Sequence, residues 1–278
     1  MTRMLLLPLL CYCQLVTAQN TTPKSIEELD LSYVYAPIFG TGFYRAGAEE
    51  ATVLKVDTNS WLLEQSERDE WYWLMPVSVG VRYTELDDIV GEVLDGSLLN
   101  VSFLPGVARR YTLTDQWEIA PSLQLGFARD LTLHTTRGLY TAALRSTNWW
   151  MHGDDRWTFG NRLRLAGQNH PTNDRRQGFL LLESGFDWER RLSTEFMGEP
   201  LLFSTFFYGQ YFIENTGIKA ISGEPVGAQS LYNLGFTVGW DRPKDILGFS
   251  VQRVGMSVAA GNNIRAYMLN LGFPLGID

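Results

Sequence analysis

Cysteine is almost absent from this chain. The 278 residues contain only Cys11 and Cys13, and both lie within the first eighteen residues. Large residues, Leu10 and Tyr12, precede them, where a lipoprotein cleavage site needs a small one. If those eighteen residues are removed, the mature chain holds no thiol. Disulfides, thiol catalysis and thiolate metal sites are then excluded.

The first eighteen residues have the composition of a secretory signal peptide. One cation, Arg3, precedes an apolar run from Met4 to Leu10, and a small residue, Ala18, stands before Gln19. We predict cleavage between Ala18 and Gln19, and therefore an exported protein. A retained membrane anchor is disfavoured, because the run is much shorter than the roughly 20 residues that a spanning helix needs.

Long apolar runs are also missing after residue 18. Apolar residues are nevertheless plentiful, aromatic residues make up 13% of the chain, and nine residues are Trp. Apolar residues interleaved with polar ones are typical of strands that meet lipid on one face and a polar lumen on the other. The sequence therefore favours an outer-membrane barrel.

Residues 71–84, WYWLMPVSVGVRYT, give the clearest case of this alternation. Odd positions are aromatic or apolar, whereas most even positions are small or polar. The same alternation occurs in residues 117–128 and 231–241, and more weakly along most of the chain. We predict an all-β fold, a transmembrane antiparallel up-and-down barrel whose odd-numbered residues between 71 and 83 face lipid.

Parity then sets the number of strands. Eleven strands can be recognised from about Gly42 onward, and bacterial barrels use even numbers. We predict Leu31–Gly40 as the twelfth strand, and a short helix before it, because Ser25 and Glu28 form a capping box. The predicted organisation is a signal peptide at 1–18, a short segment at 19–30 and the barrel at 31–278.

The connections sort into two sets when counted back from the last strand, IRAYMLNLGF. Short turns are predicted on the periplasmic side and longer loops outside. The predicted turns are 114–115, 152–155 and 241–245, with a longer one at 190–199, and the predicted outer loops are 85–96, 167–177, 215–229 and a short one at 260–263.

Some residues depart from the strand pattern. Pro76, Pro105 and Pro121 fall inside predicted strands, although a closed sheet has no free edge for a residue without an N–H. The apolar row through Val251 changes phase at Arg253, which predicts a bulge there.

Charge and histidine content limit the possible functions. The formal net charge of −8 argues against nucleic acid as a partner. Barrel hydrolases use a histidine beside a nucleophile or an acid, but His134, His152 and His170 are expected at separate turns and loops. We therefore predict no catalytic site, no metal and no cofactor.

Charged residues on the lumen face form the first group of candidate site residues. In a narrow barrel they are expected to pair across the interior, and in an open one they would act as a filter for small solutes. These residues are Arg82, Arg110, Glu118, Arg162, Arg164, Glu183, Asp187 and Asp241.

Aromatic residues near strand ends form the second group. They are expected to lie in girdles at the two membrane interfaces, in contact with outer-membrane lipid and lipopolysaccharide. They are Trp71, Tyr83, Trp117, Trp149, Trp150, Trp157, Trp188, Trp240 and Phe273.

The last third of the chain carries a family resemblance. Its strands include residues 178–185, SLYNLGFTVGWDRP, ILGFSVQRVGMSVAAG and YMLNLGF. This part resembles the solitary outer-membrane autotransporter-like barrels of marine and related gamma-proteobacteria, which are similar to a translocator barrel without its passenger. The resemblance implies twelve strands, insertion by the barrel-assembly machinery and no catalytic residues. Autotransporter barrels usually end in an aromatic residue, whereas here Phe273 is followed by residues 274–278.

Three functions follow from these observations. A structural or surface-exposed barrel is favoured, a passive channel for small solutes is the first alternative, and a barrel hydrolase is the second. The sequence identifies no ligand and no oligomeric state.

Overall fold

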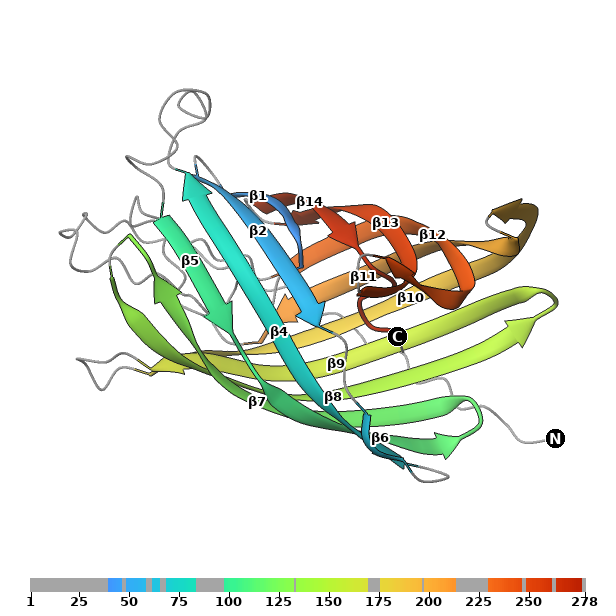
Figure 1. Ribbon diagram of the computed structural model, residues 1–278, viewed down its shortest axis with the longest axis horizontal. Coiled ribbons are helices and arrows are strands. Elements are labelled where there is room, and N and C mark those ends of the chain that lie inside the picture. The colour runs from blue at the N-terminus through green and yellow to red at the C-terminus, as the bar shows by residue number, and fades with distance from the viewer. Residues whose placement is uncertain are drawn as a thin grey trace.

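The computed structural model describes residues 40–46, 49–58, 62–65, 69–83, 98–132, 134–169, 176–196, 198–213, 230–246, 249–261 and 264–276. These residues form strands joined by turns (Figure 1). No helix in this described part is long and apolar enough to cross a membrane. The predicted signal peptide, its cleavage site and the predicted helix near Ser25 lie outside the described residues.

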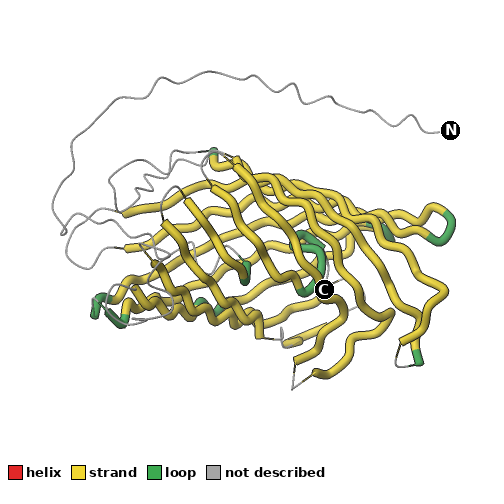
Figure 2. The backbone as a smooth tube through the Cα atoms, turned by 90° about the horizontal axis from the view of Figure 1, so that it is seen from above, coloured by secondary structure: helices red, strands yellow, loops and turns green. Residues whose placement is uncertain are grey.

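Antiparallel strands follow one another around a tilted barrel (Figures 1 and 2). They are β1 (Gly42–Ala46), β2 (Glu49–Thr58), β3 (Leu62–Gln65), β4 (Asp69–Tyr83), β5 (Leu98–Phe103), β6 (Gly106–Thr114), β7 (Trp117–Asp130), β8 (Thr136–His152), β9 (Asp155–Asn169), β10 (Arg176–Phe196), β11 (Glu199–Phe212), β12 (Ser230–Ile246), β13 (Phe249–Gly261) and β14 (Ile264–Asn270).

The barrel is closed by its first strand. β1 pairs with β14 on one side and with β2 on the other. The fourteen segments occupy twelve positions, because β2 and β3 both pair with the same side of β4, and β5 and β6 lie in succession between β4 and β7. The predicted closed antiparallel barrel of twelve strands is confirmed.

The twelve positions are filled without the strand predicted at Leu31–Gly40. Residues 31–39 lie outside the described part, and Gly40 precedes β1 without belonging to a strand. The missing strand is β1 itself, which forms a hairpin with β2. Its five residues, GFYRA, are too few to show an alternation of their own.

The two faces of the wall have opposite character. On β12, Leu234 is 65% exposed on the outer face, whereas its neighbour Asn233 is 1% exposed and faces the interior. On β4 the same contrast separates Trp73 from Ser78. Large apolar side chains therefore cover the outside of the barrel, and polar or small residues line much of its inside, as the alternation predicts.

The prolines lie where the strand ladders break. β4 pairs with β6 up to Leu74–Gly106 and with β5 from Val77–Phe103, so Pro76 and Pro105 fall in the gap between the two ladders. The ladder between β6 and β7 is interrupted opposite Pro121. A residue without an N–H is tolerated at such interruptions, which explains these departures from the strand pattern.

One end of the barrel carries tight turns, at residues 115–116, at 153–154 and near Gly198. We call it the turn end, and the opposite end, where β4 and β11 finish, the loop end. The tight turns at 115–116 and 153–154 lie where the sequence predicts short ones. The long outer loops predicted at 85–96 and 215–229, and most of the one predicted at 167–177, lie outside the described residues.

Two predicted turns at this end are wrong. Residues 241–245 lie inside β12, and β10 continues to Phe196, so the predicted long turn at 190–199 is short. These strand ends are rich in charged residues, which conceal the strand pattern. The ladder itself uses backbone groups, so strands can extend beyond the apolar belt.

The predicted bulge at Arg253 is also misplaced. β13 keeps its alternation, because Val251 and Arg253 are both buried on the inner face. The register shift lies in β12, between Gly239 and Lys244. The phase change in the sequence reflects an arginine that faces the lumen, not a break in the strand.

Candidate functional site in the barrel interior

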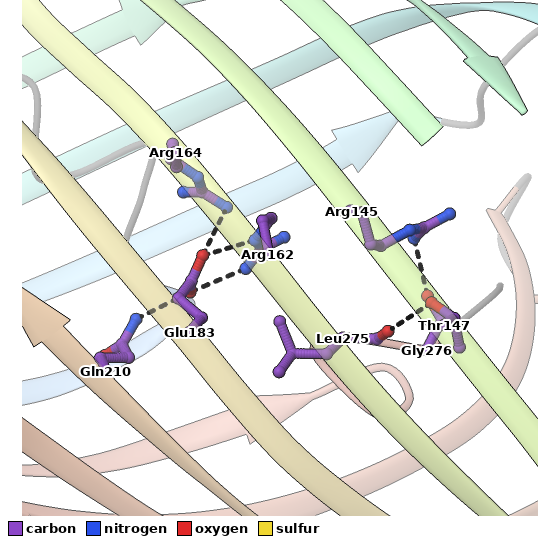
Figure 3. Close-up of polar contacts among 8 residues, drawn as sticks. All are labelled: Arg145, Thr147, Arg162, Arg164, Glu183, Gln210, Leu275 and Gly276. Carbon is purple, nitrogen blue, oxygen red and sulfur yellow. Dashed lines mark hydrogen bonds and ion pairs between the residues drawn. The ribbon is translucent and has the colours of Figure 1, made fainter. Parts of the chain in front are cut away.

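The strongest polar contact in the interior is centred on Glu183, whose side chain is 1% exposed. Glu183 is the register partner of Arg162 on β9 and of Gln210 on β11, so the pleat brings the three side chains together. Its carboxylate accepts two hydrogen bonds from Arg162, at 2.5 and 2.8 Å, and one from Gln210 at 3.0 Å (Figure 3). Arg164 lies 3.5 Å away. Three side chains from β9 and β11 thus neutralise and orient one buried acid on β10.

A second charged cluster lies nearer the turn end. Arg253 on β13 donates to Asp187 at 3.0 Å and to Glu189 at 2.9 Å. Asp187 was predicted to face the lumen, but its partner Arg253 was not. Continuing the inner row of β13 from Ser257 through Gly255 would have identified this arginine.

A third cluster lies on the opposite wall. Arg110 on β6 contacts Glu70 at 3.0 Å and Glu118 at 3.6 Å. These side chains are 15–28% exposed, whereas Glu183 is almost completely covered. This cluster lies near the turn end, because Glu70 and Glu118 are each the second residue of their strands, β4 and β7.

Two predicted members of the charge network are not joined to these clusters. The side chain of Arg82 lies outside the described part. Asp241 pairs with Arg191, and these side chains are 32% and 58% exposed. Asp241 therefore belongs to the rim of the turn end and not to the buried network.

The interior also contains a part of the chain that is not in the wall. After β14, residues Leu271–Gly276, here called the C-terminal segment, turn into the lumen, where Figure 2 shows them as the green loop within the barrel outline. Phe273 is 1% exposed and Leu275 is fully buried, and both pack with Phe206 and Tyr208 of β11. A short apolar stretch thus fills part of a polar lumen.

The position of Phe273 corrects its predicted place in an interfacial girdle. Its ring lies 5.9 Å from that of Phe206 inside the barrel. Pro274 was the available signal, because proline after the last strand ends the ladder and redirects the chain. Trp149 is likewise not in the outer girdle. It shares the inner face with Thr147, and the Arg156 guanidinium lies 5.7 Å from its ring.

Other predicted girdle residues form a band on the outer surface at the turn end. Rings of Trp150, Trp157 and Trp188 follow one another at 6.5 Å, and Phe196 stacks on Trp240 at 6.3 Å. Trp117 donates to Ser146, and Arg109 lies 5.0 Å from the Trp71 ring. The side chain of Tyr83 lies outside the described part.

Just beyond this band, Arg190 binds Asp155 through two hydrogen bonds of 2.6 and 2.8 Å. These hydrogen bonds hold the pKa of the Asp155 carboxyl below its usual value. Arg190 is 53% exposed and Asp155 is the first residue of β9, and both lie on the outer face, so this ion pair belongs to the outer surface and not to the interior.

The histidines do not gather at one site. His134 and His152 are exposed, near opposite ends of β8, and His170 lies outside the described residues. Within the described ranges, no group of three or more His, Cys, Asp or Glu side chains could hold a metal ion. What the described interior offers is therefore ion pairing and packing.

Comparison with known proteins bears on the fold. No protein-family model and no curated protein sequence matches the chain. Among solved structures, the barrel is similar to the crystal structure of the β domain of the Bordetella autotransporter BrkA, with a TM-score of 0.53 at 13% sequence identity. The match covers 82% of this chain and 94% of that chain. The chain therefore has an autotransporter-like β-barrel fold, as the resemblance of its last strands predicts.

Proposed function

We propose that the chain is a barrel of the outer membrane of a Gram-negative bacterium, with a structural or surface role and no enzymatic activity. One observation carries this proposal. Apolar side chains cover the outside of the barrel and polar side chains lie inside, which is the reverse of their distribution in a soluble protein. Leu234, Leu125 and Tyr267 are 61–65% exposed on the outside, whereas Glu183 and Asn233 are buried inside. Such a wall is unfavourable in water and matches a lipid bilayer.

Closure and the aromatic band support the same assignment. A closed barrel satisfies every strand edge, which a sheet in hydrocarbon requires. Indole rings such as Trp150 and Trp188 are favoured at the interface between lipid and water. In this setting the chain would be exported by its first eighteen residues, inserted by the barrel-assembly machinery and surrounded by lipid and lipopolysaccharide.

Heat modifiability tests the proposal directly. The purified protein, loaded in SDS without boiling, is expected to run as a compact band that shifts on boiling, because the closed ladder persists in detergent until heated. It should also stay in the membrane pellet after washing with high salt. Release by salt, together with no shift on boiling, would instead identify a soluble exported β protein.

A passive channel is the second candidate. The partly exposed charges of Arg110, Glu70 and Glu118 favour it, since water can reach these groups on the inner face near the turn end. Swelling of liposomes that contain the protein, measured with a small sugar, separates the two candidates. A permanently open channel would swell them as fast as a general porin does.

A further inference from the structure

The C-terminal segment crosses the barrel from one wall to the other. β14, from which it emerges, pairs with β13 and β1. In the ring of twelve positions, β8 stands six positions from β14 and therefore opposite it. The segment nevertheless is hydrogen-bonded to β8 (Figure 3) and also contacts β9 and β11.

Two hydrogen bonds join the segment to the far wall. Arg145 donates to the carbonyl oxygen of Gly276 at 2.7 Å, and Thr147 donates to that of Leu275 at 3.2 Å. Both acceptors are backbone groups. Residues 271–276 belong to no strand, so the ladder that secures the wall does not secure the segment.

The wall is shaped to receive Leu275. Gly160 on β9 and its register partner Gly185 on β10 carry no side chains, so the inner surface of the wall is recessed at this level. A Cβ atom at position 160 would lie 2.5 Å from the Leu275 Cβ and 2.7 Å from the Leu275 carbonyl oxygen. Only glycine leaves the room that Leu275 occupies.

The size of the barrel makes this filling significant. About eight strands enclose an interior that wall side chains alone can fill, whereas larger barrels leave space for a ligand, a plug or water. This barrel has twelve strand positions. Part of the additional space, at the level of Tyr208, is occupied by the chain's own C-terminal segment.

We propose that the C-terminal segment is a gate, which closes the lumen to small hydrophilic solutes while Leu275 is seated against Gly160 and opens it when displaced. The proposal goes beyond the structural role and rests on the membrane location proposed above. The described contacts of the segment are hydrogen bonds and apolar packing without strand pairing, which suits a reversible element, because each such contact is small compared with a strand ladder. The solutes are small sugars and ions, which the polar interior would accept.

The variant Gly160→Val tests the gate without shortening the chain. The added side chain should unseat Leu275 and raise the rate of liposome swelling with a pentose by about ten-fold or more, since overpacking of this kind is enough to shift a two-state population that far. Gly138→Val on β8 is the matched control, because a Cβ atom there meets nothing closer than 4.0 Å. It should swell at the unmodified rate.

A disulfide between positions 160 and 275 should hold the C-terminal segment in its closed position. The variant Gly160→Cys with Leu275→Cys should be open when reduced and closed when oxidised, since a segment outside the ladder can move by the roughly 1 Å needed to reach disulfide geometry. Each variant is first checked for heat modifiability. If folded Gly160→Val and the reduced double variant swell liposomes no faster than the unmodified protein, the gate is disproved while the barrel stands. Loss of heat modifiability in the unmodified protein would instead contradict the membrane barrel.

Discussion

At the scale of single residues, Glu183 bears the largest electrostatic demand in the interior. It is covered from water, and it faces Arg162 and Arg164 together. Glu183→Gln would keep the shape but leave two guanidinium groups facing a neutral amide. We expect a loss of about 3 kcal/mol in the free energy of unfolding, since removing one partner of a buried ion pair leaves the other uncompensated. Urea unfolding of the protein in lipid vesicles measures this loss.

Asp155→Asn is the matched control for that change. It also removes the acid of an arginine-bound pair, but Arg190 is 53% exposed and the pair lies on the outer surface near the turn end. We expect a much smaller effect, because water screens surface ion pairs. Since Arg190 lowers the Asp155 pKa, any contribution of the pair is present above the usual carboxyl pKa and disappears as the pH falls through the lowered one. Equal losses for the two variants would contradict the central position of Glu183.

At the scale of elements, β12 illustrates how the wall meets lipid. Leu234 projects outward six residues before Trp240 of the aromatic band, between Tyr232 and Phe236 on the same face. Leu234→Arg should lower the free energy of unfolding in vesicles by about 2–4 kcal/mol, as a cation does at the midplane of a bilayer, whereas Leu234→Phe should have little effect. If arginine is tolerated as well as phenylalanine, the outer face is not a lipid contact.

Some features of the strands could be predicted from the sequence, and others could not. The alternation of β12 and β4 could be predicted because each residue's face depends only on its position along its own strand. Ends such as Phe196 were missed, since charged strand ends in water follow the ladder without the apolar pattern. β1 was missed because five residues are too few to show a period.

At the scale of the molecule, closure depends on the short seam between β1 and β14. Gly42 in β1 lies close against β14, since a Cβ atom there would lie 2.4 Å from the Tyr267 carbonyl oxygen. Gly42→Val should therefore open the seam and abolish the heat-modifiable band at a lower temperature than in the unmodified protein. Gly138→Val again serves as control. An unchanged melting temperature of the unboiled band would show that the seam is not the weak point.

The interior contacts are a property of the whole molecule, and the sequence predicts them only in part. Placing Arg162 and Glu183 on the lumen face needs only the pleat, and their pairing follows from neighbouring strands. The contact of Arg145 with Gly276 joins residues 131 positions apart across the lumen. The hydrophobic periodicity of the sequence cannot predict such a contact, because it forms only when the barrel is closed and the chain after β14 turns inward.

The seated C-terminal segment also has a practical consequence for handling the protein. Gly276 is buried inside the lumen and bonded to Arg145 of the far wall, so a bulky label attached between Phe273 and Gly276 would have to be accommodated within the barrel. It would also disturb the packing of Leu275 with Phe206 and Tyr208. For purification, the exposed short turn at residues 153–154 is the better place for an inserted epitope.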